Sequence, residues 1–145
     1  MNNKFKNACN LVEQDSPPIW MMRQAGRYQK PYMAMKEDWT FEQMCKLPRI
    51  AAQVAMLPID QFDFDIAILF SDILFPIEGL GVPLKFDPGP KFEWHINEEN
   101  YKDHSNIELA VKHMEFQARA VTATRELLHP KKSLIGFVGG PWTLL

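Results

Sequence analysis

The sequence predicts an α/β fold in which short parallel strands alternate with helices. Three apolar runs, at residues 19–22, 65–70 and 133–137, have the length and composition of buried strands. Helical patterns lie between these runs, and that order requires crossover connections between parallel strands. The fold is therefore either a (β/α)₈ barrel (a TIM barrel) or a doubly wound sheet. Both folds place ligands at the carboxyl ends of the strands.

The helices are expected from apolar spacing and from residues that cap helix ends. Thr40 with Gln43, and Ser105 with Glu108, have the spacing of a capping box. Pro48 suits the first turn of a helix. These signals predict helices at residues 3–12, at 31–37, at 41–47, from 48 to near 58 and from 107 until Pro130, with a hairpin or extended excursion at residues 82–94.

The loop after the first run is rich in groups that bind anions. Its residues are Arg23, Gln24, Ala25, Gly26 and Arg27. A guanidinium is a planar fork of donors that matches a carboxylate with two bonds, and glycine lets the backbone approach a ligand closely. The pattern predicts an anion-binding loop. The alternative is that both arginines are surface charges that pair with Glu37 or Asp38.

The loop after the second run supplies a carboxylate. Asp72 lies between Ser71 and the apolar residues 73–75, which predicts a partly desolvated side chain. An ionised carboxylate only accepts hydrogen bonds, so it suits a ligand that directs several N–H groups to one point or becomes cationic during a reaction. The alternative is an aspartate that only stabilises a turn or caps a helix. Cations and a carboxylate on separate strand-end loops favour a ligand site.

Composition argues against several classes of function. The chain has 145 residues, 46% of them apolar, and a formal net charge of −2. This charge does not favour nucleic acid or anionic lipid, and no apolar run approaches the roughly 20 residues of a membrane span. The two distant cysteines suit a reducing compartment, and the N-terminus lacks a secretory signal. We expect a cytoplasmic protein without nucleic-acid or membrane partners.

No metal or nucleotide motif is recognisable. The four histidines lack the spacing of metal ligands, so no metal site is expected in this chain. The glycine-rich residues 136–140 fit neither the dinucleotide-binding nor the Walker pattern. They are interpreted as a turn that allows the chain or a ligand to approach closely.

Three segments resemble the uroporphyrinogen decarboxylase family. They are PPIWMMRQAGRY at residues 17–28, AILFSDIL at residues 67–74 and LIGFVGGPWTLL at residues 134–145. The first and third are similar to the two signature sequences of that family, and the three follow one another in the family's order. The resemblance runs from about Pro17 to Leu145, and it covers only the N-terminal part of the family's length.

The resemblance implies a (β/α)₈ barrel, usually homodimeric, that acts on uroporphyrinogen III in haem biosynthesis. The family removes carbon dioxide from four acetate side chains to give coproporphyrinogen III, without a metal or organic cofactor. Residues 23–27 match its substrate-binding loop, and Asp72 matches the aspartate that binds the pyrrole N–H groups. Phe70 and Phe137 match apolar positions near the macrocycle. Arg23 and Asp72 are the catalytic candidates.

Length limits what this chain can form alone. A complete barrel takes about 250 residues, and about three strands cannot close one. We therefore expect residues 1–145 to be the N-terminal part of a single barrel domain in a truncated chain, and to be inactive alone because further site residues of the family follow. Two rival interpretations are a zinc-dependent methyltransferase on the same scaffold and a non-catalytic anion-binding module.

Overall fold

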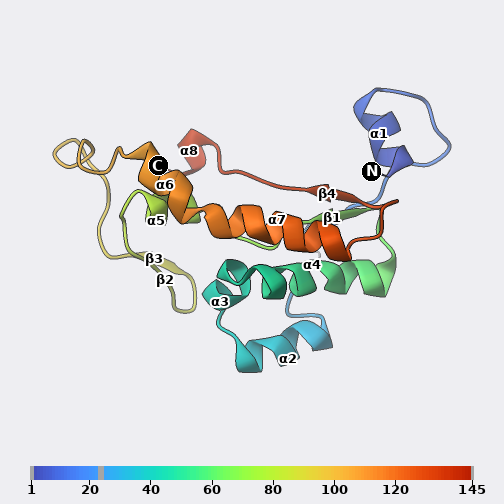
Figure 1. The fold of residues 1–145 in the computed structure, drawn as a ribbon, viewed down its shortest axis with the longest axis horizontal. Helices are drawn as coiled ribbons and strands as arrows, with labels where there is room; N and C mark the ends of the chain where they lie inside the picture. Colours follow the sequence, from blue (N-terminus) through green and yellow to red (C-terminus); the bar gives the residue numbers. More distant parts are fainter. Residues whose placement is uncertain (1, 23–24, 145) are drawn as a thin grey trace.

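The computed structural model describes residues 2–22 and 25–144 and places a two-stranded parallel sheet beside a pair of long helices (Figure 1). The helices are α1 (Asn3–Cys9), α2 (Lys30–Asp38), α3 (Phe41–Lys46), α4 (Pro48–Phe62), α5 (Phe75–Gly79), α6 (Ile107–His113), α7 (Glu115–Leu127) and α8 (Pro141–Leu144). The strands are β1 (Ile66–Ile68), β2 (Leu84–Phe86), β3 (Pro90–Phe92) and β4 (Ser133–Ile135). The sequence did not predict α5 or α8.

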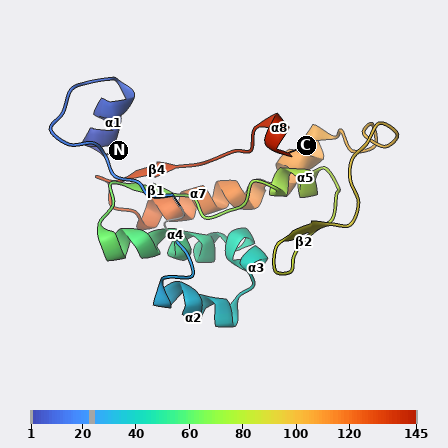
Figure 2. The same ribbon diagram turned by 180° about the vertical axis from the view of Figure 1, so that it is seen from behind.

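The sheet confirms the prediction of an α/β fold with parallel strands. β1 and β4 pair in parallel, with Ile66 opposite Ser133 and Ile68 opposite Ile135. The chain from α5 to α7 forms the crossover between the two strands. Because both strands run in the same direction, the loops that follow them leave the sheet at the same end (Figure 2).

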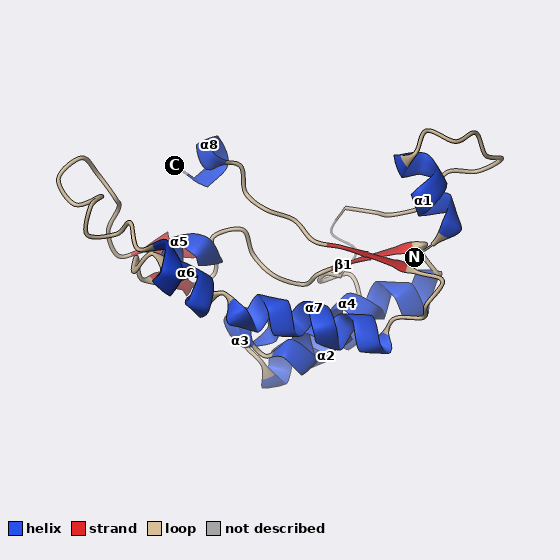
Figure 3. Ribbon diagram, turned by 45° about the horizontal axis from the view of Figure 1, so that its top comes forward, coloured by secondary structure: helices blue, strands red, loops and turns tan. Residues whose placement is uncertain are grey.

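The core lies where the sheet meets α4 and α7, which run side by side (Figure 3). Ala51 on α4 and Ala120 on α7 are buried against Leu69, which follows β1. Such small side chains at a contact allow two helices to approach closely. A second cluster, farther along the same helices, joins Ile59, Ala67 and Leu128. This core fixes the end of β1 relative to both helices.

The predicted starts of α3 and α4 are confirmed. The Thr40 hydroxyl accepts a hydrogen bond from the Gln43 backbone N–H at 3.2 Å, and the Gln43 side chain accepts one from the Thr40 N–H at 2.8 Å. Pro48 occupies the first turn of α4. The helix continues one turn beyond the buried Pro58 and ends at Asp63, which has the left-handed φ of 55°.

The prediction of a strand at residues 19–22 is wrong. The Ile19 N–H donates to the Asp65 carboxylate at 2.9 Å, and its carbonyl accepts from the Asp65 N–H at 3.1 Å. Within the described part of the chain, residues 19–22 do not pair with another strand. Met21 and Met22 are 56% and 76% exposed, so the run lacks the burial that favours a strand.

The prediction of a capping box at Ser105 is also wrong, by one residue. The Asn106 side chain accepts a hydrogen bond from the Leu109 N–H at 3.1 Å, so Asn106 is the N-cap of α6. Ser105 instead donates to the Lys102 carbonyl at 2.8 Å, in the preceding turn. Asparagine caps helices as well as serine does. The single helix expected here is divided into α6 and α7 at Met114.

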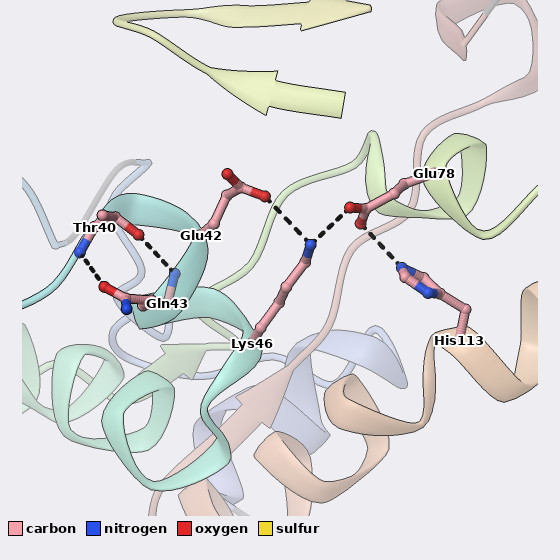
Figure 4. A network of polar contacts seen from close by, with 6 residues as sticks. All are labelled: Thr40, Glu42, Gln43, Lys46, Glu78 and His113. Atoms are coloured by element: carbon pink, nitrogen blue, oxygen red, sulfur yellow. Dashed lines mark hydrogen bonds and ion pairs between the residues drawn. The ribbon is translucent and has the colours of Figure 1, made fainter. Parts of the chain in front are cut away.

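The predicted hairpin is present, and an ionic network holds its base (Figure 4). β2 and β3 are antiparallel, and α5 and α6 lie before and after them along the chain. Lys46 Nζ on α3 lies 3.2 Å from Glu42 and 2.7 Å from Glu78 on α5. The second Glu78 oxygen lies 2.9 Å from His113 Nε2 on α6. The Glu78 side chain is only 17% exposed, so it joins three helices in a partly desolvated setting.

Candidate active site

A large hollow lies at the carboxyl end of the parallel sheet, where the sequence predicts a ligand site. Its volume is about 1140 Å³, above the roughly 300–1,000 Å³ of common small-molecule pockets. It is lined by Trp20, Met22, Ala25, Gly26, Arg27, Tyr28, Tyr32, Lys36, Phe41, Ala55, Pro58, Ile68, Leu69, Phe70, Ser71, Ile73, Pro88 and Phe137. We call this hollow the strand-end cleft.

The arginine loop, defined as residues 25–29, forms one wall of the cleft. Of the predicted anion-binding residues, Ala25, Gly26 and Arg27 line the cleft. Arg23 and Gln24 lie outside the described residues. Arg27 is exposed, and it has no ion pair with Glu37, Asp38 or any other residue in the described ranges 2–22 and 25–144. Its guanidinium is therefore available to an anion in the cleft.

Hydrogen bonds fix the shape of the arginine loop. The Gln29 N–H donates to the Gly26 carbonyl at 2.9 Å, which closes a turn. The Gly26 N–H donates to the Gln29 side-chain oxygen at 3.4 Å, and the Gln29 amide nitrogen donates to Gln61 on α4 at 2.8 Å. The Tyr28 ring lies 6.4 Å from the Phe62 ring, also on α4. These contacts attach the loop to the end of α4.

Aromatic side chains form an apolar surface in the cleft. Phe70 and Phe137, which the family resemblance placed near the macrocycle, both line it. The Phe70 ring lies 6.1 Å from Tyr32 and 5.8 Å from Phe41, in edge-to-face arrangements. These distances fall in the range of favourable aromatic pairs. The surface can accept a flat or ring-shaped apolar ligand body.

The aspartate loop, defined as residues 69–74, brings Asp72 to the edge of the cleft. Ser71 and Ile73 line the cleft, and Asp72 between them does not. One Asp72 carboxylate oxygen accepts a hydrogen bond from the Leu74 N–H at 2.9 Å, which is the turn-stabilising role considered above. Ser71 accepts a hydrogen bond from the Gln117 side chain on α7 at 2.6 Å. The loop is thus held by contacts on both sides of Asp72.

The negative charge of Asp72 acts on the buried thiol of Cys45. Burial raises the pKa of the Cys45 thiol far above its usual range, and the negative charge of Asp72 raises it further. The Asp72 carboxylate therefore lies near enough to α3, which carries Cys45, for its charge to act there.

Most residues that line the cleft were missed by sequence reasoning, among them Lys36, Tyr32 and Trp20. Lys36 adds a second cation, Tyr32 adds a buried phenol, and Trp20 adds an indole. The Trp20 Nε1 atom is buried without a hydrogen-bond partner among the described residues. Tyr32 and Lys36 are four residues apart on α2 and share a helix face, so helical spacing could have identified Lys36 once Tyr32 was placed.

Two of the histidines, His104 and His113, contact elements next to the hairpin. His104 Nδ1 lies 3.0 Å from the Leu80 carbonyl, and His113 contacts Glu78. Among the described residues, His, Cys, Asp and Glu side chains do not gather in groups of three or more that could hold a metal ion. The helices in this described part are also too short or too polar to span a membrane.

The fold and the cleft define a class of protein: an α/β protein with a cleft at the ends of parallel strands, whose lining combines two cations with an apolar surface. The family can also be named. The uroporphyrinogen decarboxylase (URO-D) family model matches residues 1–145, so the chain belongs to that family.

Individual relatives agree with this assignment. The chain is 42% identical to uroporphyrinogen decarboxylase from Geobacter sulfurreducens over 144 residues, which are 99% of this chain and 42% of that protein. It is 41% identical to the enzyme of the same name from Geobacter metallireducens, with the same coverage. For Anaeromyxobacter dehalogenans the identity is 40%, over 99% of this chain and 44% of the relative. The chain thus spans less than half the length of these relatives.

Proposed function

We propose that this chain forms part of a uroporphyrinogen decarboxylase, which removes carbon dioxide from the four acetate side chains of uroporphyrinogen III to give coproporphyrinogen III. The observation that carries the proposal is the strand-end cleft, in which Arg27 and Lys36 stand beside an aromatic surface. Uroporphyrinogen matches both features of the cleft, because its eight carboxylates could bind the cations and its macrocycle of pyrroles could contact the aromatic surface. Family membership supports the same reaction.

The cations are proposed to bind carboxylates at the rim of the macrocycle. Arg27 supplies a fork that can hold a carboxylate by two hydrogen bonds, and Lys36 supplies a point charge. We propose the same role for Arg23, together with Gln24, Ala25 and Gly26 of the same sequence motif. Phe70 and Phe137 are proposed to contact the faces or edges of the rings.

Asp72 is proposed to stabilise the cation that forms during decarboxylation. Protonation of a pyrrole carbon gives an iminium-like cation, which accepts the electron pair of the breaking bond between the acetate methylene and the departing carbon dioxide. A carboxylate about 4 Å from this cation contributes about 4 kcal/mol at an effective dielectric near 20. This is less than the ~8 kcal/mol or more that enzymes supply, so orientation and acid catalysis must add to it. Arg23 is the proposed residue that holds the reacting acetate or relays a proton.

The wider assembly is also proposed from the family. Residues 1–145 would be the N-terminal part of one (β/α)₈ barrel, in which β1 and β4 are two neighbouring strands. The complete enzyme is proposed to be a cytoplasmic homodimer that works without a cofactor. The parallel pairing of β1 with β4 and the 42% coverage of the relatives support the assignment of residues 1–145 to the N-terminal part of such a barrel.

The test is turnover of uroporphyrinogen III by the native polypeptide, expressed from its intact reading frame. Chromatographic detection of coproporphyrinogen is the expected result, and residues 1–145 alone are expected to give none. Binding of porphyrin without decarboxylation by the native polypeptide would instead support a non-catalytic binding module. Bound zinc in a native polypeptide that does not decarboxylate uroporphyrinogen would favour the methyltransferase-like alternative.

A further inference from the structure

Gln29 has a buried polar side chain. It lies just after the anion-binding motif of residues 23–27, and that motif does not explain why a glutamine is buried here. It is 2% exposed, which places it among the most buried large side chains of the described residues. It stands at the N-cap position of α2, yet its side chain does not cap that helix. Burial of an amide is costly unless both its donor and its acceptor find partners.

The partners of Gln29 connect the arginine loop to α4. Its side-chain oxygen accepts from the Gly26 N–H at 3.4 Å, and its side-chain nitrogen donates to the Gln61 oxygen at 2.8 Å. Its backbone N–H donates to the Gly26 carbonyl at 2.9 Å. Gln29 therefore holds both backbone polar groups of Gly26, and Gln61 holds Gln29. A methionine of similar length could fill the space, but it could make neither side-chain bond.

We propose that Gln29 is a positioning residue, which sets the direction in which Arg27 presents its guanidinium to a carboxylate in the strand-end cleft. The ligand class is a polycarboxylate macrocycle, so this inference rests on the proposed function. Gly26 directly precedes Arg27, and both line the cleft. A bidentate contact tolerates displacements of only about 0.5 Å, so a small movement of Gly26 weakens the contact.

Gln61 extends the same arrangement to the scaffold. It lies in the last turn of α4, the helix whose buried face packs against β1 and α7. Gln61 itself is exposed. Replacement of Gln61 therefore removes the outer partner of Gln29 without creating a cavity. This separates the effect of the hydrogen bond from the effect of packing.

The experiment compares four variants of the native polypeptide: Gln29→Met, Gln61→Met, Gln61→Glu and Gln53→Met. The last is a matched control, because Gln53 is an exposed glutamine on the same helix. Two readouts are taken. Hydrogen exchange reports the protection of the Gly26 and Arg27 amides without a ligand, and fluorescence titration gives the Kd for uroporphyrin, the octacarboxylate porphyrin used as the probe.

The expected results form a graded series. Gln29→Met speeds exchange at Gly26 and weakens uroporphyrin binding about tenfold, because it removes both side-chain bonds. Gln61→Met weakens binding about threefold, as one outer bond is lost. Gln61→Glu keeps an acceptor for the Gln29 amide and restores binding to within about twofold of the wild type. Gln53→Met matches the wild type in both readouts.

Two outcomes would overturn the inference. Wild-type affinity and wild-type exchange in folded Gln29→Met would show that Gln29 does not set the loop, and equal weakening by Gln61→Glu and Gln61→Met would exclude the hydrogen bond as the cause. If Gln29→Met does not fold, the two Gln61 variants still decide. Failure of the wild-type protein to bind uroporphyrin would instead overturn the proposed function, while exchange at Gly26 would still test whether Gln29 holds the loop.

Discussion

The arginine loop and the aspartate loop lie on the same cleft but are held in place by different means. The arginine loop depends on side chains from another element, because Gln61 and Phe62 of α4 contact Gln29 and Tyr28. The aspartate loop directly follows β1 and has its own Asp72–Leu74 hydrogen bond, with one further bond from Gln117 on α7 to Ser71. A loop that directly follows a paired strand takes much of its position from that strand. The arginine loop lacks such a strand, so its contacts with α4 must fix its position.

This difference predicts how each loop responds to mutation. Changes in the aspartate loop should alter chemistry while the loop keeps its shape. Changes in or behind the arginine loop should alter ligand affinity through geometry as well as through charge. Four further substitutions or titrations test this contrast.

The largest effect is expected for Asp72→Asn. The amide oxygen can still accept the hydrogen bond from the Leu74 N–H, so the turn should survive. The negative charge is lost, and a stabilisation of about 4 kcal/mol for the cationic intermediate corresponds to about a thousandfold fall in kcat. Steady-state formation of coproporphyrinogen by the native polypeptide measures this change. A wild-type rate in a folded Asp72→Asn variant would rule out the cation-stabilising role.

Arg27→Gln is expected to weaken uroporphyrin binding by roughly ten- to a hundredfold. Hydrogen bonds to charged groups contribute about 1.5–3 kcal/mol, and Arg27 has the only guanidinium that lines the cleft in the described part of the chain. Fluorescence titration at low and moderate salt gives the Kd values. Lys30→Gln is the matched control, because it removes the same charge three residues away and outside the cleft lining. Equal losses in both variants would indicate a general charge effect rather than a site.

The sequence predicted the strand before the aspartate loop correctly and the strand before the arginine loop wrongly. The apolar run before Asp72 is buried on the sheet, so its composition carried the strand signal. The run before the arginine loop has equally apolar letters, but Met21 and Met22 are exposed. Composition cannot distinguish these cases, because burial depends on which elements pack nearby.

Within the cleft, sequence motifs located Phe70 and Phe137 but not the residues that support them. Both phenylalanines follow strands that pair in parallel, and that pairing brings them to one end of the sheet. Gln29 and Gln117 lie at a helix start and within a helix, where a glutamine is usually exposed. Their roles depend on partners 32 and 46 residues away in the chain, Gln61 and Ser71, and only the fold reveals these partners.

A smaller effect is expected for Gln117→Met, which removes the hydrogen bond to Ser71. This bond is 2.6 Å long and partly buried, so its loss should lower the free energy of unfolding by about 1 kcal/mol. Because Asp72 keeps its own bond to Leu74, we expect kcat to fall only about threefold and KM to stay unchanged. Urea denaturation and steady-state kinetics measure the two quantities. A fall in kcat as large as that of Asp72→Asn would show that α7, rather than the loop itself, positions the carboxylate.

The smallest expected effect is a change in the pKa of Tyr32. Titration of this phenol is also the most direct test of where the Arg27 side chain points. Burial raises the pKa of Tyr32 above its ordinary value of 10.0, electrostatic interaction with Cys45 raises it further, and the positive charge of Arg27 lowers it. Because the folded pKa is raised, the folded protein holds this proton more tightly than the unfolded chain does. The resulting stability is present below pH 10.0 and is lost as the pH rises through the folded pKa.

Arg27→Gln removes the lowering influence, so the pKa of Tyr32 should rise still further. Absorbance of the tyrosinate near 295 nm follows the titration, and Tyr32→Phe identifies its component by removing it. In Lys30→Gln the Tyr32 component should not move, since Lys30 is absent from the groups that act on this phenol. If Arg27→Gln also left it unmoved, the guanidinium would lie too far from Tyr32 to face the cleft, and the arginine loop would present its charge to solvent instead.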